Sequence, residues 1–150
     1  MAAQLWLLRH GEAVPHAIDD FSRDLTERGE AQARAAGRAL AALDIVVHAV
    51  YTSPRVRAQR TAELACEALG VEPVVHEPLS GGFDVDDAHE LLVAAADQRI
   101  LVVGHNPDFA QVVYDLTGAR VDFKKGAVAG VRDHELIVLL RPRELEAIAG

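Results

Sequence analysis

Short apolar runs alternate along the chain with longer stretches in which apolar residues recur every three or four positions. The short runs predict buried strands, and the longer stretches predict amphipathic helices. The expected strands are Gln4–Arg9, Val46–Thr52, Val74–His76 and Ile100–Gly104, followed by Ala127–Val131 and Leu136–Leu140 as a closing antiparallel pair. The alternation predicts an α/β fold, namely a three-layer α/β/α sandwich with a mostly parallel sheet and a C-terminal antiparallel hairpin.

The expected helices carry start and stop signals. Polar capping residues precede most of them, two have proline near the first helical position, and one ends at glycine. The expected helices run from Thr26 to about Leu43, from Ser53-Pro54 to Gly70, over Ala88–Ala96, and from Asn106-Pro107 to about Leu116.

Length and composition fit one globular domain over residues 1–150. The chain has 15 Lys and Arg against 23 Asp and Glu, a formal net charge of −8. This balance argues against nucleic-acid and anionic-membrane partners, which require a spread of positive charge. A single cysteine, Cys66, forms no internal disulfide, and no apolar stretch reaches the length of a membrane span, so a cytoplasmic protein is expected.

Candidate chemistry lies directly after three predicted strands. The first strand leads into Arg9-His10-Gly11-Glu12, the second into Ser53-Pro54-Arg55-Val56-Arg57, and the fourth into Gly104-His105-Asn106-Pro107. In open α/β sheets, ligands bind beyond the carboxyl ends of the strands, where helices begin. Two histidines, several arginines and two helix N-termini at one edge favour a small, highly charged anion such as phosphate.

Each signal also has an ordinary structural interpretation. A histidine after a strand is commonly a hydrogen-bonded structural residue, and Ser-Pro and Asn-Pro commonly begin helices. The inference of an anion site therefore rests on all three groups of residues standing at the same place, directly after a predicted apolar strand. The remaining histidines lack such a setting and keep the structural interpretation: His16, His48, His76, His89 and His134.

The same residues resemble the histidine phosphatase (phosphoglycerate mutase-like) superfamily. Leu8-Arg9-His10-Gly11-Glu12 looks like its Arg-His-Gly signature, and Ser53-Pro54 with Arg57-Ala58 looks like its second motif. Gly104-His105-Asn106-Pro107 is similar to the third motif. Lys125-Gly126-Ala127 is similar to the short SixA-type phosphohistidine phosphatases. The ordered set covers essentially the whole chain.

The resemblance implies that His10 is the nucleophile that takes the phosphoryl group. It implies that Arg9, Arg57, His105 and Asn106 bind phosphate, with Arg9, Arg57 and His105 also in the catalytic set. Phosphoryl transfer requires mainly positioning and charge compensation, which these side chains supply without a metal or other cofactor. A phosphohistidine intermediate on His10 would then be hydrolysed by water.

Two positions differ from the family pattern. Arg60 precedes Thr61 where relatives often have glutamine, and it either extends the anion site or pairs with a surface acid. The general acid is also in doubt: Asp84 is the best-placed candidate, although helix capping is the commoner role for it. Arg55, two residues from Arg57 along a helix, is expected to point to a different face.

The segment between Gly70 and Ile100 leaves room for one strand and one helix, and for no helical lid. An open site with a weak acid favours a phosphoramidate on a bulky substrate, which is a histidine-phosphorylated protein. Two alternatives stay open. One is a phosphatase of a small phosphorylated molecule, a nucleotide or a sugar phosphate, and the other is a non-catalytic phosphate-binding module.

Overall fold

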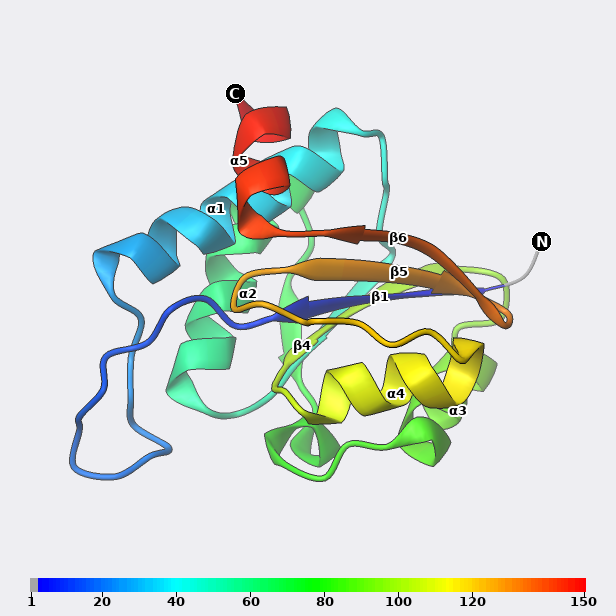
Figure 1. Cartoon of the computed structure of the whole chain (residues 1–150), viewed down its shortest axis with the longest axis horizontal. Helices are drawn as coiled ribbons and strands as arrows, with labels where there is room; N and C mark the ends of the chain where they lie inside the picture. The colour runs from blue at the N-terminus through cyan, green and yellow to red at the C-terminus, as the bar shows by residue number, and fades with distance from the viewer. Residues whose placement is uncertain (1–2) are drawn as a thin grey trace.

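The computed structural model describes residues 3–150 as one α/β unit (Figure 1). Its strands are β1 (Gln4–Arg9), β2 (Ala49–Thr52), β3 (Pro73–Val75), β4 (Arg99–Gly104), β5 (Val128–Arg132) and β6 (Glu135–Leu140). Its helices are α1 (Glu27–Ala42), α2 (Val56–Leu69), the 3₁₀ turn η1 (Glu77–Ser80), α3 (Val85–Ala94), α4 (Asp108–Thr117) and α5 (Pro142–Ala149).

The six strands form one sheet in the order β3-β2-β4-β1-β5-β6. The first four strands of the chain are parallel, with Leu7 beside Val102 in the β1–β4 pair. Strand β5 pairs antiparallel with β1 and with β6. The predicted parallel sheet with a closing antiparallel hairpin is therefore confirmed.

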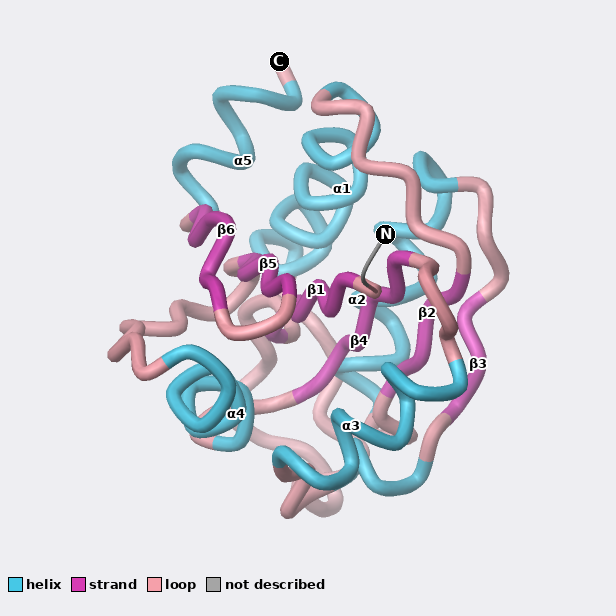
Figure 2. The backbone as a smooth tube through the Cα atoms, turned by 90° about the vertical axis from the view of Figure 1, so that its right-hand side faces the viewer, coloured by secondary structure: helices cyan, strands magenta, loops and turns pink. Residues whose placement is uncertain are grey.

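Helices cover both faces of the sheet (Figure 2). Leu5 and Leu7 of β1 face a core that includes α3 and α4. Trp6 and Leu8, on the alternate side of the strand, pack with α1, α2 and α5. Because β1 and β4 are central and buried on both faces, their carboxyl ends are held rigidly at one edge of the sheet.

Some boundaries differ from the expectation. Strand β2 begins at Ala49 rather than Val46, because the chain bends at His48 and the pairing with β4 starts only at Ala49. The eight-residue helix α5 was not predicted. At its start, Glu144 Oε1 accepts from the Arg141 amide at 3.0 Å and from Arg141 Nε at 2.9 Å. The stability of α5 depends on tertiary packing, with Leu145 fully buried in the α1 and α2 core. Among the described residues, no helix is long and apolar enough to cross a membrane.

Candidate active site

The carboxyl ends of three adjacent strands bring the predicted residues together. The His10 amide donates to the Gly104 carbonyl at 3.0 Å, and the Ser53 amide donates to the Val103 carbonyl at 3.0 Å. The rings of His10 and His105 lie 5.3 Å apart, centroid to centroid, and both residues are buried, at 5 % and 9 % exposure. The loops after β1, β2 and β4 thus form one site.

Gly11 lets the chain after His10 lie directly against the start of α1. A Cβ atom on Gly11 would lie 2.5 Å from the Gly29 carbonyl oxygen, which excludes a side chain without a backbone shift. The Gly11 amide donates to Thr61 Oγ1 at 3.1 Å, and that hydroxyl donates to the Arg57 carbonyl at 2.7 Å. Helix α2 and the loop after β1 are therefore fixed relative to each other.

The hydrogen-bond network assigns the proton positions on both imidazoles. His10 Nδ1 lies 2.7 Å from the Gly11 carbonyl oxygen, an acceptor, so Nδ1 carries the proton and Nε2 keeps its lone pair. Ser53 Oγ accepts from the Arg55 amide at 3.1 Å and lies 2.8 Å from His105 Nε2. With the hydroxyl as the donor in this second contact, a neutral His105 carries its proton on Nδ1.

Burial keeps both histidines neutral. Burial, aided by His105, Arg57 and Arg9, lowers the pKa of His10 to about 3, against the opposing hydrogen bond to Gly11. Burial, aided by Arg57, Arg55 and Arg9, lowers the pKa of His105 to about 4. An unprotonated Nε2 is the form of histidine that attacks an electrophile.

Three buried nitrogens at this site are orphaned. Across residues 3–150, the buried side-chain polar atoms found without a hydrogen-bond partner are Arg9 Nε, Arg57 Nε and His105 Nδ1. A buried donor without an acceptor is costly, and such exceptions cluster where a ligand is bound. Two guanidinium groups and an imidazole N–H beside His10 fit the oxygens of a phosphoryl group.

The two arginines are held by backbone groups. Arg9 Nη1 donates to the Phe123 carbonyl at 2.8 Å. Arg57 Nη1 donates to the Asp20 carbonyl at 2.9 Å, and Arg57 Nη2 lies 3.2 Å from Asp20 Oδ2. These contacts fix both guanidinium groups before any anion arrives.

Arg55 does not point away from the site as expected. It is the N-cap residue of α2 and lies outside the helical turns, so the helix-face argument does not apply to it. Its Nη1 donates to Asp20 Oδ2 at 2.7 Å and its Nε donates to the Ser80 carbonyl at 2.7 Å. Arg23 Nη1 donates to Asp20 Oδ1 at 3.0 Å, so one carboxylate contacts three arginines.

Sequence reasoning missed Asp20 and Arg23. Both lie in the segment between β1 and α1, which forms no helix and has only an isolated bridge between Ala13 and Leu25. Periodicity carries no signal in such a segment. The one available hint was its density of charged residues after the Arg-His-Gly signature.

The other predicted residues are placed as follows. Asn106 lines the cleft, and its Oδ1 accepts from the Ala110 amide at 3.1 Å. Asp84 caps α3: its carboxylate accepts from the Asp87 amide at 2.9 Å, and it is not among the residues that line the cleft. Arg60 pairs with Glu30 at 3.2 Å, as the surface interpretation predicts.

The site is an open cleft of about 430 Å³. Its lining joins the histidines and arginines to the loop after η1 and the start of α4. In residues 3–150, no group of three or more histidine, cysteine or acidic side chains is arranged to hold a metal ion.

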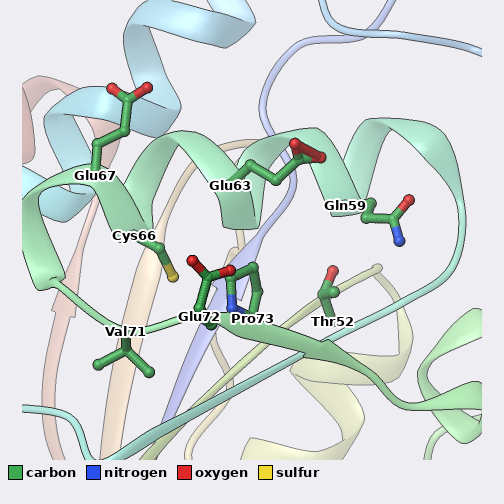
Figure 3. A pocket seen from close by; sticks show the side chains of 8 residues that line it. All are labelled: Thr52, Gln59, Glu63, Cys66, Glu67, Val71, Glu72 and Pro73. Carbon is green, nitrogen blue, oxygen red and sulfur yellow. The ribbon is translucent and has the colours of Figure 1, made fainter.

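A second hollow, of about 460 Å³, lies between α2 and β3 (Figure 3). It is lined by Glu63, Glu67 and Glu72 around Cys66. Three carboxylates repel a phosphate, so this hollow, called the acidic pocket below, does not fit the same ligand.

Comparison with known proteins identifies the family of the chain. Residues 5–81 match the model of the histidine phosphatase superfamily (branch 1). An uncharacterized protein of Picosynechococcus sp. is 32 % identical, with 95 % of this chain and 98 % of that protein covered. The chain belongs to the histidine phosphatase superfamily, and this membership supports a phosphatase activity.

Two further relatives are informative. The structure of the protein histidine phosphatase SixA complexed with tungstate superposes with a TM-score of 0.86 at 26 % identity, covering 95 % of this chain and 99 % of that one. A 2,3-bisphosphoglycerate-dependent phosphoglycerate mutase of Methylobacterium radiotolerans is 40 % identical over 83 residues, 51 % of this chain. The chain spans only 39 % of that mutase.

Proposed function

We propose that the chain is a phosphatase that takes the phosphoryl group of a protein phosphohistidine onto His10 and releases it to water. The observation that carries the proposal is the set of three orphaned donors, Arg9 Nε, Arg57 Nε and His105 Nδ1, beside a neutral His10. Tungstate is an oxyanion, and its binding by the structurally similar SixA supports an oxyanion site here.

The first step forms a bond from His10 Nε2 to phosphorus and breaks the bond to the leaving nitrogen. Arg9 and Arg57 compensate the charge on the phosphoryl oxygens, and His105 Nδ1 donates one more hydrogen bond. The Gly11 carbonyl holds the proton on Nδ1 of His10 throughout. Water then attacks phosphorus, and the bond between phosphorus and Nε2 breaks. Its electron pair returns to Nε2, so His10 leaves as the neutral imidazole, and the protons of the water pass to the released phosphate and to solvent.

The proton donors available in the cleft favour a phosphoramidate substrate, in which the leaving atom is nitrogen. The carboxylates that line the cleft belong to Asp20 and Asp108. Arg23, by a side-chain hydrogen bond, together with Arg57 and Arg55, lowers the pKa of Asp20, which makes it a poor proton donor. Asp108 accepts from the Gly82 amide at 2.9 Å. A nitrogen leaving group is protonated more readily than an alkoxide oxygen, so phosphohistidine depends least on a strong general acid.

The cleft also suits a large substrate. Between α2 and β4 the chain forms only β3, η1 and α3, and from this stretch only Ser80, Gly81 and Gly82 line the cleft, so no additional helix forms a lid there. A phosphorylated side chain on another protein can therefore reach the nucleophile. The partial match to phosphoglycerate mutases favours the second candidate, a phosphatase of small phosphorylated molecules.

A panel of donors separates these candidates. Intact-mass measurement after brief incubation with phosphoramidate, a histidine-phosphorylated protein, a sugar phosphate or a nucleotide should show an acid-labile phosphoryl group on His10. His10→Ala should abolish it, and the matched control His89→Ala, outside the cleft lining, should retain it. A higher kcat/KM for the sugar phosphate or nucleotide than for the phosphoprotein would overturn the protein-phosphatase assignment.

The arginines and His105 already supply charge compensation, so metal independence is part of the proposal. Activity after exhaustive chelation should equal the untreated activity. A loss that a divalent ion restores would contradict it.

A further inference from the structure

A third hollow, larger than the cleft and the acidic pocket, adjoins the cleft at His10. It has a volume of about 540 Å³ and shares Arg9 and Lys125 with the cleft lining. Its cationic side chains are Arg9, Arg28, Lys124, Lys125, Arg141 and Arg143. We call this hollow the basic pocket. A substrate seated at His10 can extend into it past Arg9.

The charge of the basic pocket is opposite to that of the chain. Six cations face only two lining carboxylates, Glu12 and Asp122, in a protein of net charge −8. Such a local excess raises the concentration of anionic ligands at its surface and orients their approach. The excess is not explained by the chemistry at phosphorus, for which Arg9, Arg57 and His105 suffice.

Four segments build the basic pocket. The end of β1 with the residues after it, the start of α1, the loop before β5 and the start of α5 meet at the same edge of the sheet (Figure 1). Arg9 ties this edge to the nucleophile, because its Nη1 donates to the Phe123 carbonyl in the loop before β5. The pocket is thus positioned by the same contact that positions a catalytic arginine.

Most of these cations already contact single carboxylates of the chain. Lys124 lies 2.9 Å from Asp122, Arg28 Nε lies 3.7 Å from Glu12, and Arg141 Nη2 lies 2.8 Å from Glu144. These pairs are solvent-exposed and contribute little stability, so they exchange for other carboxylates at low cost. Lys125 is exposed and has no ion pair within the described residues.

We propose that the basic pocket binds acidic side chains that flank the phosphohistidine of a protein substrate. The proposal rests on the proposed function and specifies its substrate. The cations are spread over four segments and contact three separate carboxylates of the chain, Glu12, Asp122 and Glu144, the last of which Arg141 and Arg143 share. This spread fits several separate Asp or Glu side chains. A single second phosphate group would need the cations to converge on one point.

The test compares two phosphohistidine peptides of equal length, one with glutamates on both sides of the phosphohistidine and one with glutamines. The full-length enzyme should show a kcat/KM on the order of tenfold higher for the glutamate peptide, the sum of a few exposed ion pairs. The preference should shrink at high salt, which screens such pairs.

The variant Lys124→Ala/Arg143→Ala should bring the ratio of the two kcat/KM values close to one. The matched control Arg34→Ala/Arg38→Ala removes two charges from α1 outside both linings and should keep the ratio. An equal rate for both peptides in the wild type, or an unchanged ratio in the Lys124/Arg143 variant, overturns acidic docking alone. Failure to hydrolyse either peptide overturns the proposed function, and acidic docking with it.

Discussion

The cleft at His10 and the acidic pocket have similar volumes, about 430 and about 460 Å³. Each is lined by one buried residue of a type that can act as a nucleophile, His10 in the cleft and Cys66 in the acidic pocket. In the cleft, burial lowers the pKa of His10 to about 3 and leaves the reactive, neutral imidazole. In the acidic pocket, burial and Glu72 raise the pKa of Cys66 to about 11 and leave the unreactive, neutral thiol (Figure 3).

The same desolvation therefore activates a base and silences an acid. The charge of the surroundings adds to this difference, because arginines in the cleft attract phosphate and glutamates in the acidic pocket repel it. A hollow becomes a candidate active site through the protonation state it imposes on its nucleophile, and its volume alone is uninformative.

The largest expected effect is the loss of turnover in His10→Ala. Removing the nucleophile removes the covalent route, so kcat should fall on the order of 10⁴-fold or more. Phosphate binding, measured by calorimetry, should persist because Arg9 and Arg57 remain. The counterpart in the acidic pocket, Cys66→Ala, should keep kcat. A His10→Ala enzyme of normal kcat would contradict the mechanism.

The next largest effect is expected at Arg57, one of the two arginines proposed to bind the phosphoryl oxygens. Arg57→Ala should lower kcat/KM by about 10²–10³-fold, the size typical of losing one transition-state donor. The control Arg60→Ala lies on the same helix but pairs with Glu30 and should change little. Equal losses at both positions would mean that Arg60 also contacts the anion.

The histidine pKa values predict the pH dependence of stability. An unfolded histidine has a pKa near 6.5, whereas His10 and His105 titrate at about 3 and about 4 in the folded chain. Below pH 6.5 the unfolded state binds more protons than the folded state. The contribution of the two neutral histidines to the free energy of unfolding is therefore complete above pH 6.5 and decreases as the pH drops toward 4. Urea unfolding at pH 7 and pH 5 should show the fall.

The same pKa values can be checked by NMR without unfolding. In phosphate-free buffer, the His10 and His105 ring signals should stay those of neutral imidazole down to pH 5. Imidazolium signals from His10 at pH 6 would contradict the burial argument.

A smaller effect is expected at Asp84. Because its carboxylate caps α3, Asp84→Ala should lower the free energy of unfolding by about 1 kcal/mol, and Asp84→Asn should lower it less. Both variants should keep kcat/KM on a phosphohistidine substrate. Loss of activity in Asp84→Asn with normal stability would restore Asp84 as the general acid.

The smallest effect belongs to the acidic pocket. Glu63→Gln removes one exposed charge there. It should leave kcat/KM unchanged and the free energy of unfolding within about 0.5 kcal/mol of the wild type. A large change in activity would show that the two hollows communicate.

The sequence by itself determined the strands, the layer order and the edge at which chemistry collects. The alternation of apolar runs with amphipathic helices predicts an α/β sheet. His10, Arg57 and His105 each follow one of its strands, so whether these three residues lie close together depends only on strand order and direction. The overall family was also within reach of the sequence, because its motifs are local.

The tertiary structure decided what local patterns do not encode. Asp20 and Arg23 join the site from an irregular segment with no hydrophobic period. Arg55 enters it because α2 begins at Val56, two residues later than the start at Pro54 that the sequence predicted. Helix α5 is too short to form alone and is stabilised by packing on α1. The same packing brings the start of α5 to the basic pocket, of which it forms one side. The pKa values of His10 and His105 depend on burial, which arises only when the whole chain has folded.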